Sequence, residues 1–207
     1  MKNNLFIAFE GIDGCGKSTQ ARILRDKLES AGGKVFLTCE PSTSPIGSMI
    51  RDAINNKLKA DHRVIAGLFV ADRLNHILEE SNGMLAKLRE GYTVITDRYY
   101  FSSYAYQGVH MPMDWVIQAN SLSAGLLRPD LNIYIDISPE VSMERLKNGR
   151  TTLELYESIE NLKNVRSRYF EAFELLKNKE QVFITNGDRL PEQIADDIWK
   201  KVKAVMQ

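Results

Sequence analysis

Residues 11–19 read Gly11-Ile12-Asp13-Gly14-Cys15-Gly16-Lys17-Ser18-Thr19, and they follow the short apolar run Leu5-Phe6-Ile7-Ala8-Phe9. They match the pattern G-x-x-x-x-G-K-[ST], in which a glycine-rich loop joins a strand to a helix. The glycines let backbone N–H groups converge on phosphate oxygens, and the start of the helix adds partial positive charge. We predict that all nine residues form the binding loop for ATP phosphates. Lys17 would meet the β- and γ-phosphates, and Ser18 would be a ligand of Mg²⁺.

The rest of the chain alternates short apolar runs with helical patterns. Further strands are predicted at 35–37, 92–96, 132–135 and 182–184. Helices are predicted at 17–30, about 46–58, about 62–89 with a possible break at Asn82-Gly83, along the periodic apolar residues from Tyr156 to Leu176, and from Pro191 to about 205. Strands separated by helices are typical of an α/β fold with a parallel sheet. We therefore expect a five-stranded parallel sheet flanked by helices, built as one domain over residues 1–207.

Composition excludes several classes of protein. The 27 Lys and Arg balance the 27 Asp and Glu, which argues against a protein that coats nucleic acid. No apolar run is long enough to span a membrane, and the first residues lack the pattern of a signal peptide. The two cysteines give no disulfide framework, and with only three scattered histidines the sequence argues against a structural zinc site. We expect a cytoplasmic protein with neither nucleic acid nor membrane as a partner.

Polar residues follow the predicted strands, at Glu10-Gly11, Glu40-Pro41, Asp97-Arg98, Asp136 and Asn186-Gly187-Asp188. Ligands of parallel sheets collect beyond the carboxyl ends of the strands, so we expect these residues to share one edge. There Asp97 would lie near the metal and Arg98 near the transferred phosphate. A phosphate-binding loop alone does not distinguish a kinase from an NTPase coupled to motion or from a non-enzymatic nucleotide-binding module.

A third pattern concerns the molecule that would accept a phosphoryl group if the protein is a kinase. If a helix starts near Phe101, then Ser103, Tyr106 and Gln107 lie on one face of it. Such a face presents hydroxyl and amide groups to the edge of a base and an aromatic wall to a sugar.

The sequence resembles the thymidylate kinases over nearly its whole length. The matching motifs are FEGIDGCGKST (9–19), EPSTSPIGSMIR (40–51), LFVADR (68–73), DRYYFSSYAYQG (97–108) and YIDISPEVSMERL (134–146), with weaker matches at GRTTLELYE (149–157) and VRSRYFEAF (165–173). The resemblance implies a P-loop nucleoside-monophosphate kinase fold with a short lid, at about 147–154, and an acceptor-binding region at about 41–75. It implies transfer of the γ-phosphoryl group of ATP to dTMP with Mg²⁺, giving dTDP for dTTP biosynthesis, in a homodimer. The alternative is another nucleoside-monophosphate or deoxynucleoside kinase.

The resemblance also implies roles for single residues. Arg51 would bind the dTMP phosphate, and its place after a loop rich in Ser, Pro and Gly independently suggests an oxyanion site. Phe69 would stack on thymine, and Arg73, one helical turn later, would donate to a thymine carbonyl. The other implied contacts are Ser103 and Gln107 at the base edge, Tyr106 against C2′ of the sugar, Asp13 at the 3′-hydroxyl and Pro41 in the pocket wall.

The chain departs from the family pattern at three places, one of which is Glu154-Leu155, where many members show an Asp-Arg pair after the lid. Cys39 stands before Glu40-Pro41 where the family commonly has arginine, and Gly14 leaves the phosphate loop without the arginine that some members carry there. We therefore expect the lid to supply the catalytic arginine. Arg150 is the first candidate, with Lys147 and Arg145 behind it. The expected catalytic residues are Lys17, Arg98, Arg150 and Asp13, and the expected Mg²⁺ ligands are Ser18 and Asp97.

Overall fold

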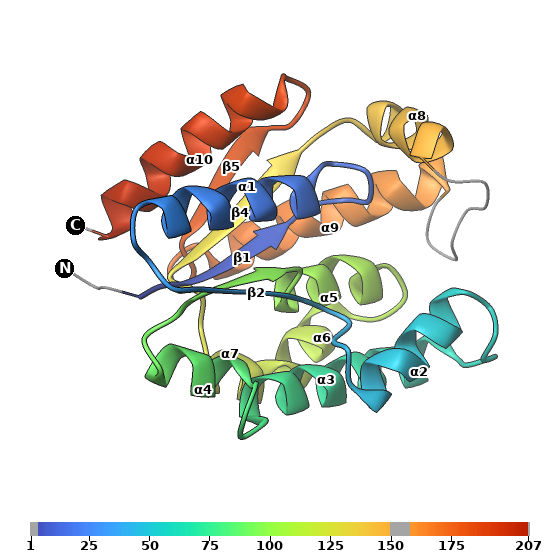
Figure 1. Cartoon of the computed structure of the whole chain (residues 1–207). Helices are drawn as coiled ribbons and strands as arrows, with labels where there is room; N and C mark the ends of the chain where they lie inside the picture. Colours follow the sequence, from blue (N-terminus) through green and yellow to red (C-terminus); the bar gives the residue numbers. More distant parts are fainter. Residues whose placement is uncertain (1–3, 150–157, 207) are drawn as a thin grey trace.

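A computed structural model describes residues 4–149 and 158–206. Its sheet contains β1 (Phe6–Glu10), β2 (Val35–Cys39), β3 (Thr93–Asp97), β4 (Leu131–Asp136) and β5 (Val182–Asn186). The strands run parallel in the order β2-β3-β1-β4-β5, which confirms the predicted five-stranded parallel sheet. All of β1 is buried, as the apolar run Phe6–Phe9 requires of a central strand that helices cover on both faces (Figure 1), and the strand ends in the buried Glu10.

Helices cover both faces of the sheet (Figure 1). Helix α1 (Lys17–Ser30) packs against α10 (Pro191–Met206) on one side, and α5 (Tyr100–Tyr106) packs against α9 (Ile159–Leu176) on the other. An aromatic cluster joins α9 to the sheet, because the Tyr134 ring of β4 lies 4.9 Å from that of Tyr169 and 5.1 Å from that of Phe173. This packing brings α5 and α9 against the carboxyl ends of β1 and β4.

A second group of helices lies beside the sheet (Figure 1). It contains α2 (Pro45–Ile54), α3 (His62–Leu78), α4 (Met84–Arg89), the 3-10 turn η1 (Gln107–Val109), α6 (Met113–Ala119) and α7 (Ser121–Leu126), while α8 (Pro139–Gly149) follows β4. The possible break near Asn82-Gly83 is confirmed, since α3 ends at Leu78 and α4 begins at Met84. The Glu79 carboxylate accepts hydrogen bonds from the N–H groups of Ser81 and Asn82 there.

The polar residues that follow β1, β3 and β4 are neighbours. In the register, Phe9 lies opposite Asp97 on one side and Ile133 on the other, so the carboxyl ends of the three strands are level. The expected shared edge is therefore present. In the part of the chain that is described, no helix has the length and apolarity that crossing a bilayer requires.

Candidate active site

The phosphate loop connects β1 to α1, as predicted. Gly11 has φ +144°, and a Cβ atom there would meet Cys15 Sγ at 2.6 Å and the Ile135 carbonyl oxygen at 2.7 Å, so glycine is required. Lys17 is buried, and its Nζ donates to the carbonyl oxygens of Gly11 and Ile12 at 3.0 Å each. The ammonium group is thus folded onto its own loop, where phosphate oxygens can replace the carbonyls as its acceptors.

Two oxygen ligands suited to a hard divalent cation lie at the start of α1. The Ser18 hydroxyl donates a hydrogen bond to Asp97 Oδ2, although the two residues lie on different elements. Hydroxyl and carboxylate oxygens are the ligands that Mg²⁺ takes in proteins, usually together with phosphate oxygens and water. This pair therefore fits the expected metal, and Lys17 immediately precedes Ser18 in the first turn of α1.

Arg98 follows β3 and adopts the left-handed conformation, with φ +73°. Its Nη2 forms an ion pair with Asp13 and donates to the Tyr106 hydroxyl at 3.3 Å, while the guanidinium carbon lies 4.9 Å from the centre of the Tyr106 ring. Burial disfavours the charge, but Tyr106 and Asp13 outweigh it and hold the pKa of Arg98 well above its ordinary value. The charged guanidinium of Arg98 thus faces the phosphate loop from the end of β3, the strand beside β1.

The loop after β2 is held by two side chains. Arg51 Nη1 donates to the carbonyl oxygens of Pro41 at 3.2 Å and Ser42 at 2.5 Å. Asp72, buried on α3, accepts from the Ser42 N–H at 2.7 Å and from the hydroxyls of Ser42 at 2.5 Å and Ser44 at 2.8 Å. The structure therefore brings Arg51 and Pro41 together, and Asp72 fixes the segment that carries them.

Arg73 lies at the bottom of the predicted base pocket and is fully buried. Its Nε and Nη2 face Glu40 Oε2 at 2.8 and 2.7 Å, and Nη2 also donates to the Tyr99 carbonyl at 3.2 Å. Its Nη1 donates to Ser103 Oγ at 3.0 Å and to Asn120 Oδ1. Every nitrogen of the guanidinium therefore already has an acceptor within the protein, so Arg73 also organises the pocket wall.

The remaining predicted acceptor-side residues are Phe69, Tyr106 and Gln107. Phe69 is half-buried one turn earlier on α3, and Tyr106 donates its hydroxyl hydrogen to Asp13 Oδ2 at 2.7 Å. Gln107 is 3% exposed, and its Oε1 has no hydrogen-bond partner within the described residues. An unpaired buried acceptor is costly unless something arrives to donate to it. It is therefore the clearest sign of a ligand in this pocket.

The lid prediction falls only partly on described residues. Helix α8 continues through Gly149, so residues 147–149 of the expected lid are helical, whereas Arg150 lies outside the described residues. Arg145 donates to the Gly187 carbonyl at 3.1 Å and pairs with Asp188, and Lys147 is exposed. Gly14 has φ +74°, and a Cβ there would lie 3.1 Å from the Ser142 carbonyl oxygen, so the backbone itself disfavours an arginine at position 14.

Cys39 ends β2 opposite Asp97 in the register, at the edge where the two sides of the site meet. Its Sγ contacts the Pro41 carbonyl oxygen at 3.9 Å, and burial, then Asp97, raises the pKa of the thiol. The residue adds no positive charge to the acceptor side, where Arg51 and Arg98 are the predicted phosphate-binding cations.

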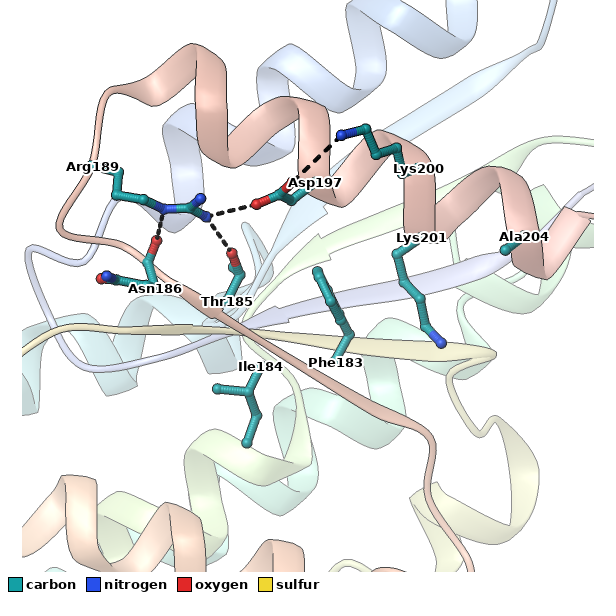
Figure 2. A pocket seen from close by; sticks show the side chains of 9 residues that line it. All are labelled: Phe183, Ile184, Thr185, Asn186, Arg189, Asp197, Lys200, Lys201 and Ala204. Carbon is teal, nitrogen blue, oxygen red and sulfur yellow. Dashed lines mark hydrogen bonds and ion pairs between the residues drawn. The ribbon is translucent and has the colours of Figure 1, made fainter.

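A separate open groove of about 650 Å³ lies between β5 and α10, and none of the residues predicted to bind ATP, dTMP or Mg²⁺ lines it (Figure 2). Arg189 crosses it and donates to Thr185 Oγ1 at 3.1 Å, to the Asn186 carbonyl at 3.2 Å and to Asp197 at 2.9 Å. Because Asp197 neutralises its guanidinium, Arg189 joins β5 to α10 and is not available to bind an anion in the groove.

Four residues of the site were not predicted from the sequence: Glu40 as the partner of Arg73, Asp72, Asn120 and Tyr169. The Tyr169 ring packs in the aromatic cluster, as the apolar periodicity of α9 suggests, but its hydroxyl lies 2.9 Å from Glu10 Oε2. A tyrosine on a buried helix face usually finds a polar partner for its hydroxyl, and that signal was available. The other three have no local pattern that reveals their partners.

Comparison with known proteins agrees with this geometry. The family model described as Thymidylate kinase matches residues 9–198. Proteins named probable thymidylate kinase match from Pyrococcus horikoshii (37% identity over 204 residues, covering 96% of this chain and 95% of the relative) and from Pyrobaculum aerophilum (37% over 204 residues, 98% of each). A third, from Pyrobaculum calidifontis, is 41% identical over 166 residues, 80% of each chain. With the five-stranded parallel sheet and the phosphate loop facing Arg98, these matches show that the chain belongs to the thymidylate kinase family.

Proposed function

We infer that the protein is an ATP-dependent dTMP kinase, which transfers the γ-phosphoryl group of ATP to dTMP and forms dTDP and ADP for dTTP biosynthesis. The observation that carries this inference is the contact between Arg98 and Asp13. Through it, an acceptor-side arginine meets a residue of the phosphate loop, so that donor and acceptor phosphates converge at one point. The names of the relatives, and the buried polar side chains of Arg73, Ser103 and Gln107, favour dTMP as the acceptor.

On the donor side, the loop from Gly11 to Thr19 cradles the ATP phosphates and Lys17 neutralises them. Ser18 and Asp97 would hold Mg²⁺, which supplies charge neutralisation between the phosphates when it is bound. No general base is required, because the attacking oxygen of the dTMP phosphate is already anionic. The work of the protein is therefore to align two phosphates and to exclude water.

On the acceptor side, Arg51 and Arg98 bind the dTMP phosphate from opposite flanks. Phe69 covers one face of the thymine ring, and the unpartnered Gln107 Oε1 accepts the N–H hydrogen at the base edge. Ser103 lies beside Arg73 Nη1, so a thymine carbonyl can share that donor with Asn120.

The sugar contacts come from the pair that flanks Arg98. Tyr106 closes against C2′ of the sugar and disfavours ribose, and Asp13 accepts from the 3′-hydroxyl. Pro41 completes the pocket wall.

The lid completes the charge balance. Arg150 approaches the γ-phosphoryl group as it moves, because position 14 of the phosphate loop does not accommodate an arginine side chain without strain. Lys147 is the alternative donor of that charge. Arg145 is a weaker candidate, since it is already engaged with Gly187 and Asp188.

A homodimer is part of this proposal. Large apolar side chains lie exposed on three helices that pack together: Val64 and Leu78 on α3, Trp115 on α6, and Leu122 and Leu126 on α7. A second copy of the chain would remove this surface from water. Sedimentation velocity, with Leu122→Glu as the interface variant, tests it. A wild-type protein that sediments as a monomer at micromolar concentration would refute it. The cytoplasmic location remains a prediction.

The experiment that tests the function is an acceptor panel. ADP release is followed with dTMP, dUMP, AMP, CMP, GMP or thymidine as acceptor, with Lys17→Ala as the inactive control. We expect dTMP to be preferred over dUMP by about 10–200-fold, as one methyl group in an apolar pocket allows. Equal turnover of AMP and dTMP would contradict the assignment.

A further inference from the structure

Glu10, the last residue of β1, is a fully buried carboxylate outside the set of residues assigned above to ATP or dTMP. Its Oε1 accepts the Tyr99 N–H at 2.9 Å. Its Oε2 accepts the Ser102 hydroxyl at 2.6 Å and the Tyr169 hydroxyl at 2.9 Å. A buried carboxylate with this many donors orders the groups around it, because each hydroxyl hydrogen that points at the carboxylate is unavailable elsewhere.

The ordering of Ser102 bears directly on Arg98. Since the Ser102 hydrogen is donated to Glu10, the lone pairs of its oxygen are free to accept, and Arg98 Nη1 donates to that oxygen at 3.0 Å. Tyr169 supports the same arrangement, because its hydroxyl also lies 2.9 Å from Ser102 Oγ and 3.4 Å from the Gly11 carbonyl oxygen. Arg98 Nη1 reaches that carbonyl at 3.3 Å.

Arg98 needs such support. It has φ +73°, which is an unfavourable conformation for a residue with a side chain, so its direction depends on the contacts around it. Asp13 and Tyr106 hold one end of the guanidinium, and both also face the predicted sugar site. Ser102 holds the other end, at Nη1.

We propose that Tyr169 is a positioning residue of the reaction, which acts through Glu10 and Ser102 to hold the Arg98 guanidinium toward the transferred phosphoryl group. The proposal rests on the proposed function. The test compares the kcat of wild type and variants with dTMP and ATP as substrates. A wild-type protein without dTMP kinase activity would refute the proposed function. An active wild type whose variants have the same kcat would refute only the role of Tyr169.

The test begins with two matched substitutions. Tyr169→Phe removes a hydroxyl that contacts Glu10 and Ser102, while the ring keeps its packing against Tyr134 and Phe173. Tyr134→Phe removes a hydroxyl from the same aromatic cluster that has no hydrogen-bond partner within the described residues. We expect Tyr169→Phe to lower kcat by about 10–100-fold, as small displacements of a catalytic group do, with little change in the KM for ATP. Tyr134→Phe should leave kcat within about twofold of wild type.

A double-mutant cycle separates positioning from general stability. If Tyr169 acts through Arg98, then adding Tyr169→Phe to Arg98→Lys should lower kcat by less than about twofold, because the guanidinium that Tyr169 positions is already replaced. The same cost in both backgrounds would overturn the proposal, and so would a wild-type kcat for Tyr169→Phe. Should Tyr169→Phe fail to fold, Ser102→Ala on α5 replaces it in the same cycle, with the same two outcomes.

Discussion

The guanidinium of Arg98 and the carboxylate of Asp13 form an ion pair between the carboxyl end of β3 and the phosphate loop that follows β1. The other oxygen of Asp13 accepts the Tyr106 hydroxyl at 2.7 Å, so the carboxylate is held on both sides. An incoming phosphate must share Arg98 with Asp13. The pair therefore keeps Arg98 in place before the substrates arrive, and it makes binding of dTMP an exchange of one anion for another.

Arg98→Ala should reduce catalysis more than binding. Because the charge of Arg98 is fixed and aimed at the transferred group, its loss should lower kcat by about 100–1000-fold, as loss of one preorganised stabiliser of a transition state does. Arg98→Lys should recover part of it, since a point charge lacks the planar fork. The measurement is steady-state kinetics, with Arg22→Ala, at an exposed arginine of α1, as the control. An increase in the KM for dTMP without a fall in kcat would place Arg98 in binding only.

Arg51→Ala should mainly weaken the binding of dTMP. Arg51 lies on the acceptor side and approaches the transferred group less closely than Arg98 in our proposal. We expect the KM for dTMP to rise by about 10–100-fold, the cost of one charge-assisted hydrogen bond, while the KM for ATP stays the same. Thermal melting of the variant controls for collapse of the Pro41–Ser42 loop, which Arg51 also holds. Equal effects on both substrates would argue against this role.

Gln107→Met should make the protein less active but no less stable. The substitution keeps the length of the side chain and removes the Oε1 that is buried without a partner. We expect kcat/KM for dTMP to fall about 10–100-fold while Tm stays equal or rises, because only the complex uses that acceptor. Gln118→Met on α6 is the exposed control. A large drop in Tm with unaltered kcat/KM would show that Gln107 is a core residue.

Arg150→Ala tests the source of charge in the lid. An arginine that meets the transferred phosphoryl group contributes several orders of magnitude, so kcat should fall about 100-fold or more with little change in the KM for dTMP. Lys147→Ala, three residues away, is the paired variant and should lower kcat far less. The opposite ranking of the two variants would move the role to Lys147. Gly14→Arg on the Arg150→Ala background should recover part of the activity, and the strain of a side chain at φ +74° should keep the recovery incomplete.

Stability should fall in mild acid because of a histidine pair. His62 at the start of α3 and His110 after η1 stack at 3.7 Å with their planes 10° apart. Burial, and then His62, lowers the pKa of His110 below its ordinary value. The unfolded chain therefore binds more protons, so this contribution to stability is complete above about pH 6.5 and is lost as the pH falls below it. Tm measured between about pH 7.5 and 5.5 should fall less steeply for His110→Asn than for wild type. Equal slopes would contradict the prediction.

The parts of the site that could be predicted are those encoded in contiguous sequence. The loop from Gly11 to Thr19 and the Asp97-Arg98 pair are short motifs at strand ends, and the parallel sheet places such ends together whatever the side chains are. The five strands follow from apolar runs. The break after Leu78 follows from turn residues.

The parts that could not be predicted depend on tertiary register. Glu40 and Arg73 are 33 positions apart, and Arg73 and Asn120 are 47 apart, so no local pattern pairs them. Helices α6 and α7, of 7 and 6 residues, are too short to show a helical period. The role of Tyr169 depends on which residue of α9 lies over Glu10, and periodicity alone describes it as one more apolar position.

The most direct test of the account follows the phosphoryl group itself. Wild-type protein is incubated with Mg²⁺, dTMP and ATP labelled at the γ-phosphate, and the labelled products are separated by chromatography. The label should appear in dTDP, in amounts equal to the ADP formed, and the reaction should depend on Lys17 and Arg98. Label released as inorganic phosphate at the same rate with and without dTMP would contradict the account and identify an ATPase.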